Sequence, residues 1–153
     1  MTETRSTDDD VPARRLVKRF YEEVWNKADE AVAREILHDD LSFRGSLGVV
    51  HTGREGFLQY MRATLTALAE YECVIEDLIA SETRAAARMT FTGIHRGVFF
   101  GVPGTGRRIS WAGNAFFSTD GRQITELSVL GDIDAIKRQL GIGVGWIGSP
   151  LGD

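Results

Sequence analysis

The spacing of apolar residues changes close to Tyr71 in this chain of 153 residues. Before that point apolar residues recur every three to four positions, which is the period of a helix that buries one face. After it they alternate with polar residues in short segments bounded by turn signals, as strands do. Helices followed by one long run of strands are typical of an α+β domain, with the helices on one face of an antiparallel sheet. Alternating βαβ units are excluded.

Three helices are predicted before the change in spacing. The strongest periodicity runs from Leu16 to Trp25 and forms one continuous apolar face. A shorter helix is predicted over residues 31–37, ending at His38-Asp39-Asp40, so that the two form a helical hairpin. A brief extended stretch, LSFRG at 41–45, is expected to follow. Thr52 and Glu55 have the spacing of a capping box, which predicts the start of a third helix.

Five β-rich segments follow, and we expect them to pair as an antiparallel meander. Because three helices must pack against this sheet, it should be strongly curved, and glycines within the segments allow bends and bulges. A bent sheet with helices over its concave side tends to leave a cavity. A last helix is predicted over residues 133–140, ending at Gly141. The segments are CVIEDLIA, RAAARMTFTGIH, VFFGV, RRISWAGNAFFST and QITELSVLGD.

Length and charge exclude several classes of function. The length suits one domain, and a formal net charge of −4 offers no basic field for nucleic acid or an anionic membrane. No apolar run approaches the roughly 18 residues of a membrane span, and the first residues are polar rather than signal-like. We therefore expect a cytoplasmic protein. The single cysteine, Cys73, excludes an intrachain disulfide and is predicted to be a core thiol.

The chain divides into three parts on composition. Residues 1–10 are acidic and polar, and are expected to be a disordered lead-in. Residues 11–141 contain all the periodic segments and form the domain. Residues 142–153 combine apolar side chains with glycines, which make regular structure costly. This tail is expected to form either a lid over the cavity or a contact with another subunit.

Four stretches of the chain resemble the SnoaL-like polyketide cyclase family, within the nuclear-transport-factor-two-like fold class. They cover most of the chain in the family's order, and Thr92 to Arg107 is the most specific part. The resemblance implies a cone-shaped barrel in which a strongly curved antiparallel sheet packs against N-terminal helices, encloses an apolar pocket and usually forms a homodimer. The stretches are FYEEVWNKAD at 20–29, HTGREGFLQYM at 51–61, RMTFTGIHRGVFFGVPGTGRRIS at 88–110 and GRQITELSVLGDIDAIKRQLG at 121–141.

The resemblance implies that Asp132 is an acid/base residue, because the cyclases carry an aspartate at the end of the last strand. A carboxyl at the bottom of an apolar pocket loses hydration, which would raise its pKa and let it transfer protons near neutral pH. Aspartate is also among the best residues for capping the N-terminus of a helix, and the last helix begins at Ile133. The two interpretations are compatible.

The three histidines suggest no metal site, because they lack metal-ligand spacing. His51 lies where the family often turns a side chain toward the cavity, so it is a second catalytic candidate or a surface turn residue. His95 is expected to hold a strand turn together, and His38 is assigned no chemistry. We expect neither a metal nor a cofactor.

Several strand residues are candidates for lining the pocket. The apolar ones belong to alternating strands and are equally well explained as core residues. Arg88 could bind a carboxylate or an enolate oxygen, or lie on the solvated face. Asn114 has the opposite strand parity to Trp111, so at most one of the two faces inward. The apolar candidates for substrate binding are Trp111, Phe43, Met89, Phe91 and Phe117.

Three functions remain open at this stage. The resemblance favours a cofactor-independent cyclase of polyketide-like natural products, with Asp132 and His51 as catalytic residues and a small hydrophobic substrate. Another pocket enzyme, such as a hydroxylase or an epoxide-opening cyclase, is the second. A hydrophobic-ligand-binding protein without catalysis is the third, because this fold class hosts all of these functions.

Overall fold

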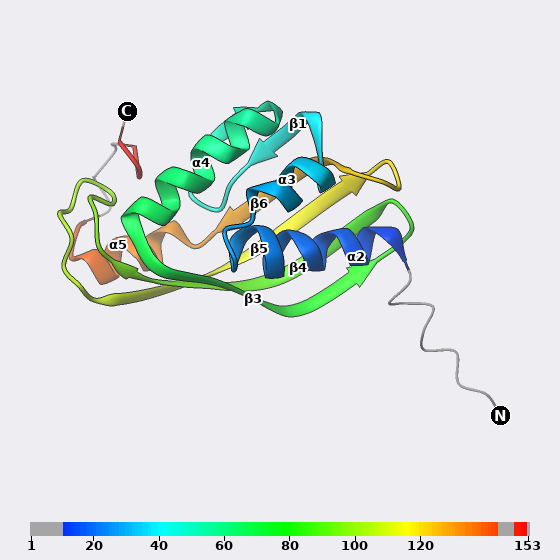
Figure 1. Cartoon of the computed structure of the whole chain (residues 1–153). Coiled ribbons are helices and arrows are strands. Elements are labelled where there is room, and N and C mark those ends of the chain that lie inside the picture. Colours follow the sequence, from blue (N-terminus) through cyan, green and yellow to red (C-terminus); the bar gives the residue numbers. More distant parts are fainter. Residues whose placement is uncertain (1–10, 144–148, 153) are drawn as a thin grey trace.

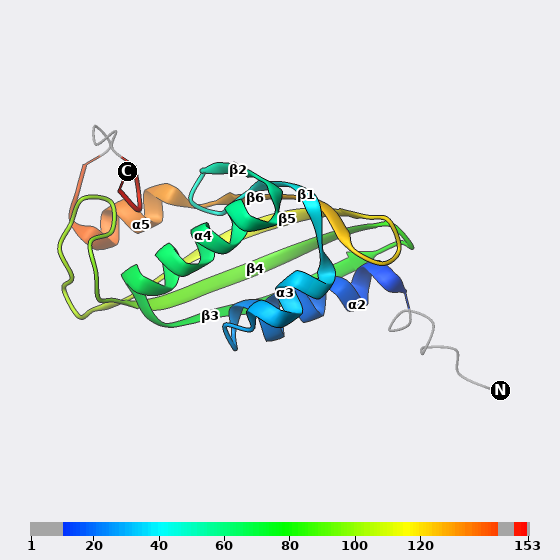
Figure 2. The ribbon, with the colours of Figure 1, turned by 45° about the horizontal axis from the view of Figure 1, so that its top comes forward.

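Helices cover one face of a curled six-stranded sheet, as Figure 1 and Figure 2 show, which confirms the predicted α+β class. The computed structural model describes residues 11–143 and 149–152. The predicted lead-in and part of the tail therefore lie outside the described residues. The strand order is β2-β1-β6-β5-β4-β3, so the edge strands β2 and β3 do not pair and the sheet is not closed into a barrel.

The first predicted helix is present, but it changes its winding halfway. Helix α2 (Pro12–Arg19) starts with a proline at its first turn, where the missing N–H is not needed. It continues directly as a π-helix, η1 (Phe20–Trp25), in which the N–H of Asn26 reaches back to the carbonyl of Tyr21 at 3.0 Å. The wider turn directs four of six side chains into the core: Phe20, Tyr21, Val24 and Trp25.

The second helix is shorter than predicted. Helix α3 (Glu30–Ile36) is capped by the Asp29 carboxylate, which accepts a hydrogen bond from the N–H of Val32 at 3.1 Å. The predicted helix end at residues 38–40 is wrong, because strand β1 (Leu37–Arg44) begins directly after Ile36. Leu41 and Phe43 are buried on alternate positions of this strand, within the stretch LSFRG that was expected to be extended.

Helix α4 (Gly53–Ala67) is confirmed, although not by the capping box that predicted it. Thr52 occupies the N-cap position, but its side chain makes no capping hydrogen bond. Glu55 pairs with Arg34 of α3 instead, so a tertiary ion pair replaces the local one. The last helix, α5 (Ile133–Leu140), has the predicted bounds and ends at Gly141, whose φ of 77° suits glycine.

The sheet is antiparallel except for one pair. Strands β3 (Leu68–Ala80), β4 (Arg84–His95), β5 (Arg108–Thr119) and β6 (Ile124–Gly131) form the predicted meander. Strand β1 pairs with β2 (Val50–Thr52) antiparallel and with β6 in parallel, which corrects the expectation of a wholly antiparallel sheet. The parallel pair arises because β1 precedes α4 in sequence, while β6 returns beside it after the meander.

The segment VFFGV is not a strand of the sheet. It lies in the connection of residues 96–107, where one isolated bridge joins Phe99 and Val102. His95 at the root of this connection is fully buried. Its Nδ1 lies 2.9 Å from the Thr105 hydroxyl, and its Nε2 lies 3.0 Å from the Val102 carbonyl. These contacts confirm the structural role that the sequence predicted for His95.

Strand alternation separates a concave inner face from an outer face. Along β5, alternate residues from Ile109 to Thr119 are buried under the helices, and those between them face outward. Two bulges in β3 add to the curl of the sheet. At Gly113 a Cβ would lie 2.8 Å from the Phe91 ring, so this position admits only glycine beside that ring.

Candidate functional site

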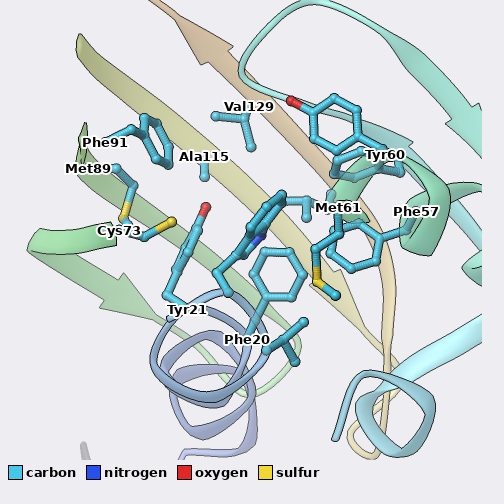
Figure 3. Close-up of a cluster of buried hydrophobic side chains, with 14 of the residues drawn as sticks. Phe20, Tyr21, Phe57, Tyr60, Met61, Cys73, Met89, Phe91, Ala115 and Val129 are labelled. Atoms are coloured by element: carbon cyan, nitrogen blue, oxygen red, sulfur yellow. The ribbon is translucent and has the colours of Figure 1, made fainter. Parts of the chain in front are cut away.

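The concave side of the sheet is almost filled by aromatic side chains. A residual void of about 10 Å³ remains among them, which is near the smallest space that one water molecule can occupy. Figure 3 shows these side chains between the helices and the sheet. We call the lining residues the interior site: Phe20, Tyr21, Trp25, Phe43, Gly45, Ser46, Tyr60, Tyr71, Phe91, Leu127 and Val129.

Ring geometry makes the interior site rigid. Phe20 meets Tyr21 edge to face with ring centroids 5.0 Å apart, and the rings of Tyr71 and Phe91 are parallel within 4° at 6.4 Å. Such aromatic pairs contribute about 0.5–1.5 kcal/mol beyond the burial of their area. The interior therefore offers flat apolar faces that are held in place by one another.

Two buried donors in this region have no hydrogen-bond partner within the part of the chain that the structure describes. They are the hydroxyl of Tyr21, which is 1% exposed, and the indole Nε1 of Trp111, which is 3% exposed. Burial raises the pKa of Tyr21 well above its usual value, so the hydroxyl keeps its proton and can act as a hydrogen-bond donor. An unsatisfied buried donor costs roughly 1–3 kcal/mol.

Tyr60 is held by the connection between β1 and β2. Ser46 and the backbone of Leu47 hydrogen-bond its hydroxyl, while burial raises the pKa of Tyr60 to about 12. Its ring packs against Gly45, where an added Cβ would lie only 2.5 Å from two atoms of Tyr60. Position 45 must therefore be glycine for Tyr60 to occupy this place. Burial also raises the pKa of the Tyr71 hydroxyl, which interacts with the Cys73 thiol.

A second hollow of about 260 Å³ lies on the other side of Tyr60. We call it the outer groove, and Tyr60 is a wall of both this groove and the interior site. The described end of the tail adjoins it, and the carbonyl of Pro150 accepts a hydrogen bond from the N–H of Phe100 at 2.7 Å. The groove is lined by Val49, His51, Gln59, Tyr60, Ala63, Ser149, Leu151 and Gly152.

His51 lies in the outer groove and does not line the interior void. It is half-buried on β2, and its ring centroid lies 6.2 Å from that of Phe43 and 5.5 Å from that of Tyr60. Both neighbours belong to the interior site. The imidazole is thus separated from the interior by one ring. Val144, Trp146 and Ile147 of the predicted lid lie outside the described residues.

Asp132 is exposed and caps helix α5. Its Oδ1 accepts a hydrogen bond from the N–H of Ala135 at 3.0 Å, which confirms the capping interpretation. The expected position at the bottom of an apolar pocket is corrected, because the Asp132 side chain is exposed and does not line the interior void. The backbone of Gly131 packs on Ser46, which lines the interior site, but the Asp132 side chain is not among the residues that line the void.

The other predicted residues fall into three groups. Phe43 and Phe91 line the void, whereas Trp111, Met89 and Phe117 are buried in the core around it.

Arg88 is exposed on the outer face of the sheet, in register with Asp77 and Asn114. A side chain on that face cannot contact a ligand in the interior, because the sheet lies between them. Asn114 is exposed and Trp111 is buried, as their opposite parity predicted.

Sequence reasoning did not identify the hydroxyl groups of the interior site. Tyr21 stood on the apolar face of a predicted helix, and Tyr60 only flanked one. The available signal was that both tyrosines fall at buried helical positions, where a polar tip usually finds a partner. Which hydroxyl lacks one depends on contacts between segments far apart in the sequence.

Within residues 11–143 and 149–152, no group of three or more His, Cys, Asp or Glu side chains is arranged to hold a metal ion. None of the helices in these ranges has the length and apolarity that crossing a membrane requires.

Comparison with known proteins places this architecture. A family model described as SnoaL-like polyketide cyclase matches residues 15–140. A search of curated protein sequences finds no match. TsrD from Streptomyces laurentii is 26% identical, with a TM-score of 0.76 over 87% of this chain and 97% of that one.

Two further solved structures carry cyclase names. IdmH from Streptomyces antibioticus, assigned provisionally as a polyketide cyclase, is 25% identical with a TM-score of 0.72, covering 86% of this chain and 99% of its own. A SnoaL-like polyketide cyclase from Agrobacterium tumefaciens is 20% identical with a TM-score of 0.69, covering 86% and 99%, and shows the fold alone. With the family model matched over most of its length, this chain belongs to the SnoaL-like polyketide cyclase family.

Proposed function

We propose that this protein is a cofactor-independent cyclase that closes a ring in a polyketide-like substrate bound at the interior site. Family membership supports a cyclase-type function. The observation that carries the proposal is an aromatic interior with hydroxyl donors, with His51 in the outer groove that shares the Tyr60 wall. Flat aromatic walls suit a planar, carbonyl-rich ligand.

The reaction that fits this arrangement is an intramolecular aldol closure. A base removes a proton from the carbon beside one carbonyl, and the resulting enolate carbon bonds to a second carbonyl carbon. The new alkoxide then takes up a proton, so the net change is isomerisation with no cofactor. Buried tyrosine hydroxyls stabilise the oxyanions as donors, while proton transfer falls to Asp132 or His51.

Substrate binding requires Tyr60 to move. The interior void holds about 10 Å³, far less than the roughly 300–1,000 Å³ typical of ligand pockets. The outer groove of about 260 Å³ lies directly behind Tyr60. Displacing this one ring joins the two spaces and brings a bound substrate within reach of His51.

A ligand-binding protein without catalysis is the second candidate. It is favoured by the composition of the interior lining, where the described residues include hydroxyl groups but neither a carboxylate nor an imidazole. Both candidates place a hydrophobic ligand at the same site, so they differ only in whether bound ligand is converted.

The test is turnover of a naphthyl-substituted 1,5-diketone, a compound that can close by an aldol step, followed by product chromatography. We expect both Asp132→Asn and His51→Gln to bind the diketone normally. Whichever of the two residues is the acid/base group, its substitution should lower kcat by about 100-fold or more. Asparagine is as good an N-cap as aspartate, so Asp132→Asn preserves α5.

Asp132→Ala serves as the matched control for the cap, since it removes the carboxylate and the capping oxygen together. Loss of turnover in Asp132→Ala with normal turnover in Asp132→Asn would assign Asp132 to structure alone. Binding of the diketone without any ring closure by the wild-type protein would favour the second candidate.

We also infer that the protein is a homodimer formed through the outer face of its sheet. By outer face we mean the surface around the exposed apolar side chains of Val74, Ile79, Phe116 and Leu130. Ile79, Ala86 and Phe116 are aligned across β3, β4 and β5, so they form a continuous apolar row. Apolar patches of this kind on a soluble protein mark interaction surfaces.

A further inference from the structure

The Tyr21 hydroxyl is the one polar group of the interior lining that is buried and unpartnered among the described residues. The hydroxyl of Tyr60 has partners in Ser46 and Leu47, and that of Tyr71 has a partner in Cys73. Figure 3 shows the Tyr21 ring rising from its helix with the oxygen directed toward the sheet near Ala115. The hydroxyl is therefore aimed into the interior and not back at its own helix.

The winding of the helix explains how Tyr21 reaches this position. Tyr21 is the second residue of the π-helix, and its ring is held by edge contacts to Phe20 at 5.0 Å and Phe117 at 5.9 Å. The Phe91 ring is a third neighbour, and its centroid lies 6.5 Å from that of the Tyr21 ring. These neighbouring rings fix the orientation of the Tyr21 ring. Its hydroxyl is therefore positioned as a donor before any ligand binds.

The surroundings define the ligand chemistry. Apart from the uncharged Cys73 thiol, the side chains around Tyr21 are aromatic or aliphatic, and no cationic side chain is among the described lining residues. A neutral donor in such surroundings selects an uncharged oxygen acceptor, or one whose charge develops during reaction, over a carboxylate or a phosphate. A ketone attached to a flat ring system provides both an uncharged acceptor oxygen and a shape that fits between aromatic side chains.

We propose that Tyr21 is the residue that recognises the ligand, by donating a hydrogen bond to a ketone or enolate oxygen at the interior site. The inference rests on the proposed function for the location of the ligand. It goes further by naming the group that is recognised and the side chain that recognises it. Selection then follows from exclusion: a ligand lacking the oxygen leaves the donor unpaired.

The test uses two probes of the same shape, 2-acetylnaphthalene and 2-isopropenylnaphthalene, which differ by a carbonyl oxygen in place of a methylene group. We expect the wild-type protein to bind the ketone more tightly, and Tyr21→Phe to reduce ketone affinity by about fivefold to tenfold without affecting the alkene. Isothermal titration measures both. In the infrared, the ketone C=O band should lie at lower wavenumber in the wild type than in Tyr21→Phe.

Thr119→Val is the matched control, because it removes a different buried hydroxyl that lies outside the interior site. It should leave the preference for the ketone intact. Thermal unfolding of Tyr21→Phe without ligand should be no easier than that of the wild type, since an unpaired donor is lost. A hydroxyl that only supported the fold would give the opposite result.

Equal binding of the two probes by the wild type, or an undiminished ketone preference in Tyr21→Phe, would overturn the inference. So would the failure of the ketone to bind the wild type at all. The assay contains no turnover step. A protein that prefers the ketone through Tyr21 but never closes a diketone would therefore retain this inference and lose the cyclase proposal.

Discussion

All three tyrosines of the chain, Tyr21, Tyr60 and Tyr71, are buried in the interior site. Burial raises the pKa of each, to about 12 for Tyr60, because the phenolate loses its hydration while the neutral phenol does not. The interior thus contains donors that cannot serve as bases near neutral pH. On the proposed function, proton abstraction therefore falls to a residue outside the interior lining, such as His51 in the outer groove.

The same shifts predict how stability depends on alkaline pH. The folded-state pKa values lie above the unfolded value of about 10, so the full stability is present below about pH 10. It falls by about 1.4 kcal/mol per pH unit for each tyrosine as the pH rises toward the folded pKa. Urea unfolding at a series of pH values between about 9 and 11 measures this slope.

Tyr60→Phe should reduce the slope by the share of one tyrosine and serves as the internal control. Phenolate absorbance should stay low until the protein unfolds, and no other tyrosine in the chain contributes to that signal. Phenolate appearing near pH 10 in protein that is still folded would mean that at least one ring is reached by solvent.

Among the elements, the turn between β1 and β2 controls the position of Tyr60. The Tyr60 ring packs so closely on Gly45 that a side chain at position 45 would overlap it. The N–H of Gly45 donates a hydrogen bond of 3.1 Å to the carbonyl of Val49, which closes the turn. The turn and α4 therefore hold the ring between the interior site and the outer groove. Any change that dislodges the ring should open the interior.

Gly45→Ala tests this coupling. The added methyl group would overlap the Tyr60 ring, so we expect a loss of about 1–3 kcal/mol in unfolding free energy and faster association of 2-acetylnaphthalene. Urea unfolding and stopped-flow fluorescence measure the two effects. In a Tyr60→Ala background the same change should cost little, because the clashing ring is gone.

Gly143→Ala is the matched control, since a Cβ at Gly143 meets nothing within 4 Å. It should alter neither quantity. Slower association in Gly45→Ala than in the wild type would show that Tyr60 does not obstruct the way into the interior site.

Local sequence signals predicted the elements that depend on local sequence alone. Strands β4 and β5 and helix α5 appear where alternation, turn residues and a C-terminal glycine predicted them. Residues 37–40 of strand β1 were mistaken for a helix end, although the rest of the strand was expected to be extended. Its parallel partner β6 lies more than 80 residues away in sequence, as the pair Phe43 and Leu127 shows. Pairing at such separation is decided by packing, which no local pattern records.

The candidate site was predictable only in part for the same reason. Alternation identified Phe43 and Phe91 correctly as inward-facing residues, but it gave Arg88 no face. Asp132 was recognised as both a cap and a catalytic candidate, and only the cap could be read from its position before a helix. Whether the exposed Asp132 carboxylate meets a substrate depends on where the substrate binds, which the amino-acid sequence alone does not determine.

At the scale of the whole molecule, the outer face is apolar where a solvated sheet face would be polar. Ile79, Phe116 and Leu130 are 67%, 59% and 67% exposed, although each lies on a strand of the central sheet. Asp77 and Arg88 flank this surface in register with each other, so both signs of charge are present. A patch carrying both signs is able to match a rotated copy of itself, which is what a twofold interface requires.

Phe116→Glu should therefore separate the two subunits. A carboxylate buried at the centre of an apolar interface has no partner. We therefore expect the dissociation constant of the dimer to rise by at least about 100-fold. Sedimentation of wild type and variant across micromolar concentrations measures it. Lys27→Glu, an exposed change in the helix layer, controls for altered charge and should leave the dimer intact.

Because position 116 faces away from the interior, the Phe116→Glu variant should keep its secondary structure and still bind 2-acetylnaphthalene. A wild-type protein that sediments as a monomer at tens of micromolar, or a Phe116→Glu variant that remains dimeric, would place any subunit contact elsewhere.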